Sequence, residues 1–180
     1  MGVSLVEILD ASALDQTCQG LAADILAAYP VWQQVVLIGI RTRGVPLAHR
    51  LAGHLQQWTG SERRIPVGAL DITFFRDDLT QSGLRTPDLS QIPGDLTQQQ
   101  VILVDDVIFR GRTIRAALEA LNHLGRPQVV RLAVLIDRGH RELPIHPDFV
   151  GLSITTQPND QVRVHLREQD GEDRVFVEQN

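Results

Sequence analysis

Lysine is absent from this 180-residue sequence, in which all 17 basic residues are arginine. The absence excludes a Schiff-base lysine, a Walker A lysine and any other site that needs a tunable ammonium group. Cys18 is the single cysteine and cannot form a disulfide within the chain, as is typical of a protein from a reducing compartment. We therefore expect Cys18 to be a small core-facing residue of the first helix.

Long apolar runs are also missing. None approaches the roughly 20 residues needed to span a bilayer, and the N-terminus lacks the basic and apolar parts of a secretory signal. A cytoplasmic protein without a membrane partner is therefore expected. The net charge is −5, and residues 1–40 carry four acids but no arginine or histidine, which argues against a surface that coats nucleic acid.

The chain has the length of one domain, residues 1–180, and its pattern alternates strands and helices. Helices are expected from Asp10 to about Leu26, over 45–58 and over 113–124. Strands are expected over 34–40, 65–75, 100–104 and 129–136, followed by a hairpin of 162–167 and 174–178. The polar segment 76–99 is too long for a simple connection and is interpreted as a mobile functional loop. The pattern predicts an α/β fold with a central, mostly parallel sheet flanked by helices.

The run Val101–Thr113, VILVDDVIFRGRT, describes a buried strand, a pair of acids, a tight loop and the start of a helix. Free backbone amides and the helix dipole favour a phosphate at such a loop. Gly111 allows close approach of an anion, and the Thr113 hydroxyl adds a donor. Asp105 and Asp106 suit the hydroxyls of a ribose and can help to hold a hydrated Mg²⁺, directly or through water.

A second polar strand end lies at Gly39–Gly44, where two arginines flank Thr42. Two guanidinium groups and exposed amides in a turn suit a diphosphate. Taken alone, this segment fits equally well with solvated arginines that cap a turn and bind no ligand. Ligands of parallel sheets gather at the carboxyl ends of strands, so both segments are expected in one site. A receiver domain would need a lysine, and a dinucleotide fold would need G-x-G-x-x-G after its first strand. His140 and His146 lack partners at zinc-like spacing.

The run Val101–Thr113 resembles the 5-phosphoribosyl-1-pyrophosphate (PRPP) signature of the type I phosphoribosyltransferases. From Ile8 onward, nearly the whole chain resembles the PyrR family, whose members are pyrimidine operon attenuation regulators and uracil phosphoribosyltransferases. The matching segments are GIRTRGVPLAHRLA, VGALDITFFRDDL, VILVDDVIFRGRTIRAALEAL, GRPQVVRLAVLIDRGHRELPIHPDFVG and the tail ending in VFVEQN. Within them, DRGHRELPI discriminates among base specificities and indicates uracil.

The resemblance implies a type I phosphoribosyltransferase fold with a long flexible active-site loop, a small hood and a C-terminal β-hairpin. It implies the following binding residues: Arg41, Thr42, Arg43 and Gly44 for pyrophosphate, Asp105 and Asp106 for the ribose hydroxyls, Phe109, Arg110, Gly111, Arg112 and Thr113 for the 5′-phosphate, and Val107 and Ile108 beside the base. Asp137, Arg138, Gly139 and His140 would form the hood that reads the uracil edge. Arg76 and Asp77 would lie on the closing loop and complete the catalytic set with the two acids.

The implied reaction converts uracil and PRPP to UMP and diphosphate with Mg²⁺, in a homodimer or larger homo-oligomer. Related signatures usually have threonine at the position of Arg110, so this arginine either reaches the phosphate or swings outward. The basic first helix of the better-known RNA-binding relatives is replaced here by an acidic one, and only Arg138, Arg141, Arg163 and Arg167 remain as candidate contacts to pyr leader RNA. Two alternatives stay open: a UMP-sensing RNA-binding regulator with little transferase activity, and a phosphoribosyltransferase for another base.

Overall fold

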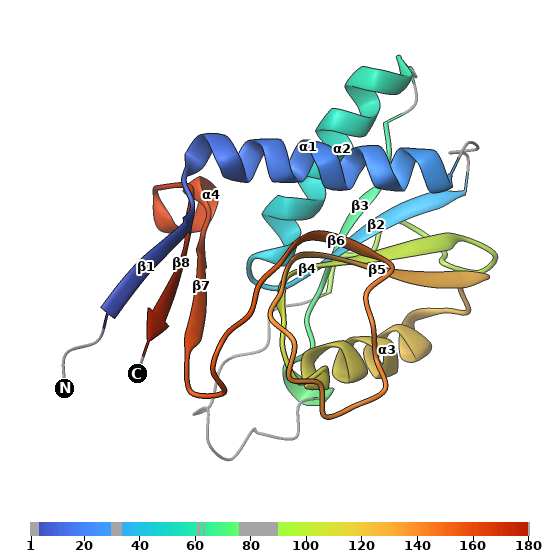
Figure 1. The fold of residues 1–180 in the computed structure, drawn as a ribbon. Helices are drawn as coiled ribbons and strands as arrows, with labels where there is room; N and C mark the ends of the chain where they lie inside the picture. The colour runs from blue at the N-terminus through green and yellow to red at the C-terminus, as the bar shows by residue number, and fades with distance from the viewer. Residues whose placement is uncertain (1–3, 30–33, 61, 63, 76–89, 180) are drawn as a thin grey trace.

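A five-stranded parallel sheet forms the centre of the protein, in the order β3-β2-β4-β5-β6 (Figure 1). The computed structural model describes residues 4–29, 34–60, 62, 64–75 and 90–179. The strands are β2 (Val35–Ile40), β3 (Val67–Leu70), β4 (Gln100–Ile108), β5 (Val129–Asp137) and β6 (Phe149–Ser153). Every residue of β2 is buried, as expected for a parallel strand covered on both faces. The predicted α/β architecture is confirmed.

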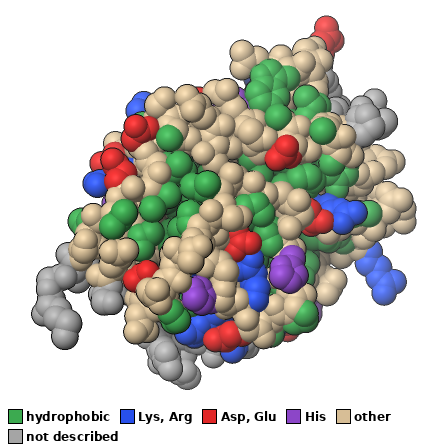
Figure 2. Space-filling model, viewed as in Figure 1, with side chains coloured by type: hydrophobic (Ala, Val, Ile, Leu, Met, Phe, Trp, Pro, Cys, Tyr) green, Lys and Arg blue, Asp and Glu red, His purple; other side chains and the backbone are tan. Residues whose placement is uncertain are grey.

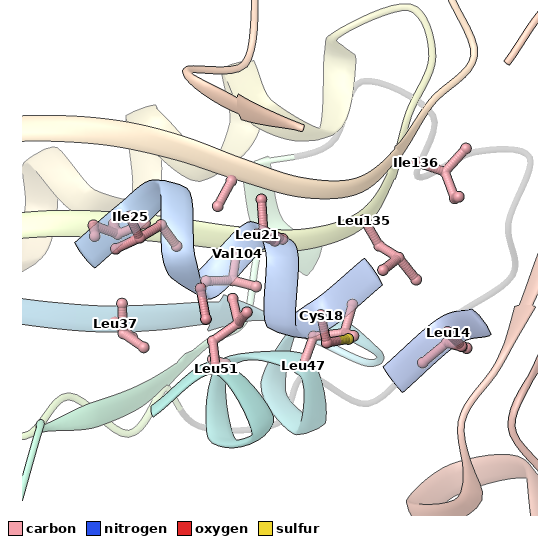
Figure 3. Close-up of a cluster of buried hydrophobic side chains, with 14 of the residues drawn as sticks. Leu14, Cys18, Leu21, Ile25, Leu37, Leu47, Leu51, Val104, Leu135 and Ile136 are labelled. Atoms are coloured by element: carbon pink, nitrogen blue, oxygen red, sulfur yellow. The ribbon is translucent and has the colours of Figure 1, made fainter. Parts of the chain in front are cut away.

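Helices cover both faces of this sheet. The helices α1 (Ala11–Ala28) and α2 (Gly44–Thr59) pack on one face, and α3 (Arg112–Leu124) packs on the other (Figure 1). Successive side chains of a strand point to opposite faces. Leu37 of β2 accordingly joins the cluster beneath α1 and α2 (Figure 3), whereas Ile38 joins the cluster beneath α3.

The first helix follows the sequence closely. Asp10 is its N-cap, and the Asp10 carboxylate accepts a hydrogen bond from the Ala13 amide at 2.8 Å. The predicted apolar face is buried, with Leu26 only partly so. Cys18 points into this core, and burial raises the pKa of its thiol to about 12 (Figure 3). The thiol is therefore an inert packing group at neutral pH, as predicted.

A separate three-stranded antiparallel sheet lies beside the carboxyl ends of the central strands, in the order β1-β8-β7 (Figure 1). Its strands are β1 (Ser4–Leu9), β7 (Gln161–His165) and β8 (Arg174–Gln179). The predicted hairpin is confirmed as β7 and β8, and a four-residue helix, α4 (Arg167–Asp170), occupies the connection between them. Ser4 pairs with Gln179, so the two ends of the chain lie side by side.

Three sequence expectations differ from the structure. The strand expected over 65–75 ends at Leu70, because the Asp71 carboxylate accepts a hydrogen bond from the Thr73 amide and turns the chain into a 3-10 helix, η1 (Thr73–Phe75). Phe74, within the range expected to form a strand, is 74% exposed. The last part of the expected polar loop contributes buried Leu96 to the core, while residues 76–89 lie outside the described part of the chain.

Two strands were missed from the sequence, β1 and β6. Most residues of β1 are exposed, and β6 is only partly buried, so neither shows a clear alternation of apolar and polar residues. Within the described ranges, no helix has the length and hydropathy required to cross a membrane.

Candidate active site

Two loops meet at the carboxyl edge of the central sheet: the first loop (residues 41–44) after β2 and the second loop (residues 109–113) after β4. Two glycines let the first loop pack directly on its neighbours. A Cβ atom on Gly39 would lie 2.4 Å from the carbonyl oxygen of Gly44, and one on Gly44 would lie 2.2 Å from that of Val104. The first loop is therefore pressed against β4 immediately before Asp105. Its Arg41–Thr42 peptide bond is cis.

The acid pair lies within β4, which continues four residues beyond the strand end predicted at Val104. The Asp105 carboxylate accepts a hydrogen bond from the Asp106 amide at 3.0 Å, and the Asp106 carboxylate accepts one from the Val107 amide at 2.8 Å. Burial raises the pKa of Asp106, while its contacts with Asp105 and Val107 and the positive charge of Arg43 oppose that rise. Arg43 of the first loop thus lies within electrostatic reach of Asp106.

The second loop combines a left-handed residue with the start of a helix. Gly111 has φ +91° and is the N-cap of α3. Its carbonyl oxygen accepts a hydrogen bond from the Arg115 amide at 3.0 Å. A cavity of about 410 Å³ lies along this segment, lined by residues 107–114. Backbone amides at a helix N-terminus favour anions, so the cavity has the character expected of a phosphate site.

Arg110 and Arg112 of the second loop both bind Glu142. The Nε atom of Arg110 lies 3.1 Å from one Glu142 oxygen, and Nη2 of Arg112 donates to the other at 2.7 Å. The guanidinium of Arg110 also lies 5.0 Å from the centre of the Phe109 ring. About half of the Arg110 side chain is exposed. Arg110 therefore binds Glu142 at the border of the cavity, and whether it also reaches a phosphate stays a prediction.

The expected uracil-reading residues, 137–140, follow directly from the end of β5 and are not part of the antiparallel sheet. Their side chains mostly bind other parts of the protein. Arg138 is buried and donates to the Thr156 hydroxyl and to the carbonyls of Gln157 and Asp160, at 2.7–3.2 Å. Its guanidinium lies 4.0 Å from the centre of the Phe109 ring. Arg138 therefore ties the end of β5 to the segment that enters β7.

Asp137 and His140 are similarly engaged. Asp137 accepts hydrogen bonds from the Gly139 amide and from Nη2 of Arg141, and these contacts hold its pKa below the ordinary value against the opposing effect of burial. The Nε2 atom of His140 lies 2.8 Å from the Thr156 carbonyl oxygen. Figure 2 shows acidic, basic and histidine side chains gathered over the segments that follow β5.

Arg141 joins this segment to the second loop. Its Nη1 donates to the Phe109 carbonyl at 2.9 Å, and the Glu142 amide donates to the Arg110 carbonyl at 3.1 Å. The Arg138 amide donates to the Ile108 carbonyl as well. The end of β4, the second loop and the segment that follows β5 are therefore held together by two backbone hydrogen bonds and by the Arg141 side chain.

Arg43 makes the longest-range polar contact of the site. Its Nε and Nη2 atoms donate to the two Asp170 oxygens at 3.1 and 2.7 Å, across 127 residues of sequence. The hydrogen bond from Arg43 holds the pKa of Asp170 below its ordinary value. Asp170 ends α4, so the small sheet contributes a side chain to the edge of the site.

The structure brings together the predicted residues of the two loops, the acid pair and the start of the segment after β5. Arg76 and Asp77 lie outside the described residues, so their expected place on a closing loop stays a prediction. Arg141, Glu142 and Asp170 were missed as site neighbours. No local pattern marks them, because each meets its partner only through the fold.

Sequence comparison relates the chain to one protein family along most of its length. Residues 4–169 match the family described as "Phosphoribosyl transferase domain". The chain is 59% identical over 175 residues to the "Bifunctional protein PyrR" of Synechococcus sp. (strain JA-2-3B'a(2-13)), covering 97% of this chain and 95% of that protein. It is 50% identical over 171 residues to the protein of the same name from Thermus aquaticus, covering 94% and 93%.

Solved structures share the fold at much lower identity. A hypoxanthine-guanine phosphoribosyltransferase from Bacillus anthracis str. 'Ames Ancestor' superposes with a TM-score of 0.72 at 16% identity, covering 99% of this chain and 100% of that one. A hypoxanthine phosphoribosyltransferase from Staphylococcus aureus gives 0.66 at 16% identity, covering 99% and 92%. At this identity the likeness concerns the fold and not the base that is bound.

Proposed function

Because the chain belongs to the PyrR family, within the phosphoribosyl transferase domain family, we propose that it is a uracil phosphoribosyltransferase. The reaction converts uracil and PRPP to UMP and diphosphate. The uracil assignment rests on the PyrR relatives and on the DRGHRELPI segment, whereas the phosphoribosyl chemistry also has support from the geometry of the site.

The observation that carries the proposal is the direct packing of the first loop on β4. The Gly44 backbone lies so close to Val104 that no side chain fits between them. This contact sets Arg43 beside Asp106, at the strand end that continues into the second loop. PRPP carries a diphosphate, a ribose and a 5′-phosphate in that order, and the three segments offer matching groups in the same order along the sheet edge.

Each segment has a separate role in this proposal. Arg41, Thr42, Arg43 and Gly44 bind the diphosphate through guanidinium groups and backbone amides. Asp105 and Asp106 accept hydrogen bonds from the ribose hydroxyls. Residues 109–113 hold the 5′-phosphate at the N-terminus of α3. Val107, Ile108 and the backbone of residues 137–140 border the uracil.

Mg²⁺ suits the donors present at this edge. Asp105 and Asp106 are both carboxylates, the ligand type that Mg²⁺ prefers, and the described residues hold no group of three or more histidine, cysteine or acidic side chains placed for a metal. Such a site fits a cation that keeps most of its ligands as water and diphosphate oxygens. When bound, Mg²⁺ would neutralise charge on the diphosphate, while the two aspartates would hold it directly or through water.

Displacement at the anomeric carbon needs no protein nucleophile. The sugar passes through a cationic, oxocarbenium-like state, so catalysis depends on positioning and on charge stabilisation. Arg76 and Asp77 are proposed to lie on a loop that closes over the substrate and excludes water that would hydrolyse PRPP. We also propose that the protein acts in the cytoplasm as a homodimer or larger homo-oligomer.

A steady-state assay of diphosphate release with PRPP, Mg²⁺ and a panel of uracil, hypoxanthine, guanine and orotate tests the proposal. We expect turnover with uracil alone and a loss of at least about 100-fold in Asp106→Asn, since an amide is a poorer partner for ribose hydroxyls and Mg²⁺. Turnover with a purine base would move the assignment to another base. No turnover above the Asp106→Asn control with any base would refute the transferase.

A second function, as a UMP-responsive regulator that binds pyr leader RNA, is suggested by the name "bifunctional" of the relatives. The charges of this chain weigh against it. The exposed side of α1 carries Asp15 and Asp24, Arg138 is buried, and Arg163 pairs with Glu178 at 3.0 Å. A gel shift with leader RNA, with and without UMP, distinguishes the two: retention at nanomolar protein would establish the regulator.

A further inference from the structure

We propose that Asp170 is a positioning residue for diphosphate binding, acting through Arg43. The inference rests on the proposed function, because it assigns a partner to an arginine of the expected diphosphate loop. Asp170 lies on α4, in the connection between β7 and β8 of the small antiparallel sheet. Its link to the first loop is the pair of hydrogen bonds that it accepts from the Arg43 guanidinium.

Asp170 is itself a fixed group. One of its oxygens, Oδ2, accepts the Leu166 amide at 2.9 Å, while its own amide donates to the Leu166 carbonyl at 2.7 Å. The carboxylate therefore has a defined position before Arg43 binds to it. A guanidinium that donates two parallel hydrogen bonds to such a group loses rotation about its long side chain.

The bidentate contact uses one edge of the guanidinium and leaves the other edge for a ligand. Nε and Nη2 donate to Asp170, and no described residue accepts a hydrogen bond from Nη1. The next residue, Gly44, packs on Val104 immediately before the acid pair, so Arg43 joins the small sheet to this edge of β4. Arg43 is thus held with its remaining donors in the region where the diphosphate is expected.

The connection between β7 and β8 also binds a second arginine, Arg50, and this contact provides a control for the docking of the small sheet. Arg50 lies seven residues further along α2, where its Nη2 donates to Glu168 and to Asp173, each at 2.6 Å. Both contacts dock the small sheet on α2, but Arg50 is not part of the first loop. A change at Glu168 therefore weakens docking without removing the partner of Arg43.

Calorimetric titration with inorganic diphosphate in Mg²⁺ buffer, and separately with UMP, tests the proposal on the full chain. In Asp170→Asn we expect diphosphate affinity to fall about three- to tenfold and UMP affinity to stay within about twofold, since only one bidentate charged contact is lost. In turnover assays the KM for PRPP should rise by the same factor with little change in kcat. Glu168→Gln should leave all of these values unchanged.

Several results would overturn the proposal. Unchanged diphosphate affinity in Asp170→Asn would do so. Tighter diphosphate binding in that variant would show that Asp170 competes with the ligand for Arg43. An equal loss of diphosphate affinity in Glu168→Gln would show that the effect comes from docking of the small sheet. Thermal unfolding shows whether Asp170→Asn folds; if it does not, Asp170→Glu keeps the charge but moves the carboxylate, and it should weaken diphosphate binding in the same way. If the wild-type protein binds UMP but not diphosphate, this inference alone is refuted. If the wild-type protein binds neither ligand and shows no turnover, the proposed function is refuted.

Discussion

The two loops of the site hold their arginines in different ways. Arg43 of the first loop binds a carboxylate 127 residues away, on a turn whose own backbone fixes that carboxylate. Arg112 of the second loop shares Glu142, only 30 residues away, with Arg110, and all three side chains are substantially exposed. Exposed ion pairs contribute about 0–1 kcal/mol, so the arginine side chains of the second loop can rearrange around a ligand at little cost. The first loop is instead set by the docking of two sheets.

Gly44→Ala should produce the largest effect, because it disrupts the packing that fixes the position of the first loop. The new methyl group would lie 2.2 Å from the Val104 carbonyl oxygen, so one of two backbone segments must move. We expect a loss of about 3 kcal/mol or more in the free energy of unfolding, together with loss of turnover. Urea unfolding and the diphosphate-release assay measure both.

Gly111→Ala in the second loop is the matched control. An added Cβ would meet its nearest atom at 3.5 Å, which is ordinary contact, so only the left-handed backbone opposes the substitution. The expected cost is about 1–2 kcal/mol. Equal costs at the two glycines would contradict the difference between the loops.

Acidification should weaken the ion pairs that dock the small sheet beside the first loop, and its effect on the free energy of unfolding should lie between those of the other changes. Hydrogen bonds from Arg43 and Arg50 lower the pKa values of Asp170 and Glu168, and contact with Arg50 outweighs burial to lower that of Asp173. A lowered folded-state pKa gives stability that is fully present above the unfolded-state value of about 4 and is lost as the pH falls through the folded-state values. Asp106 has the opposite sign, because its raised pKa gives stability that is lost as the pH rises through it.

Urea unfolding between pH 6 and pH 2 checks this expectation. The decline below about pH 4 should be smaller in Arg50→Gln, which lacks the partner of Glu168 and Asp173. A decline of the same size in Arg50→Gln would show that these carboxylates are not its source.

Glu142→Gln should have the smallest effect. The exposed carboxylate contributes at most about 1 kcal/mol to folding. The substitution removes the negative charge that Arg110 and Arg112 both bind, so we expect UMP to bind about two- to threefold more tightly. Calorimetric titration with UMP measures the change. Weaker binding would show that Glu142 holds the arginines in a productive position.

Much of the fold could be predicted from local patterns. The Asp10 cap and the spacing from Leu14 to Ile25 define α1, and the apolar run before Arg41 defines β2. The patterns failed where partners are distant. β1 is mostly exposed and is a strand because it pairs with β8 at the other end of the chain. The strand expected after Ile65 ends early because Asp71 binds the backbone two residues on.

The candidate site divides in the same way. Arg41–Gly44, the acid pair and residues 109–113 stand out in the sequence because strand ends, glycines and charged residues follow one another within a few positions. The Arg138 side chain is buried because its guanidinium donates to the carbonyls of Gln157 and Asp160, contacts that no local pattern predicts. Its expected place beside the base stays a prediction. The ion pair of Arg110 with Glu142 was likewise not predictable from the sequence, because its two members lie on different segments.

The sequence by itself determined the order of groups in each segment: the glycines and arginines of the two loops, the paired acids and the apolar face of the first helix, all of which depend on neighbours along the chain. Only the tertiary structure decided how the segments act together. The parallel sheet aligns the carboxyl ends of β2 and β4, so that Gly44 rests on Val104. The docking of the small sheet then gives Arg43 its partner, Asp170, because a hydrogen bond across 127 residues depends on the packing of both sheets.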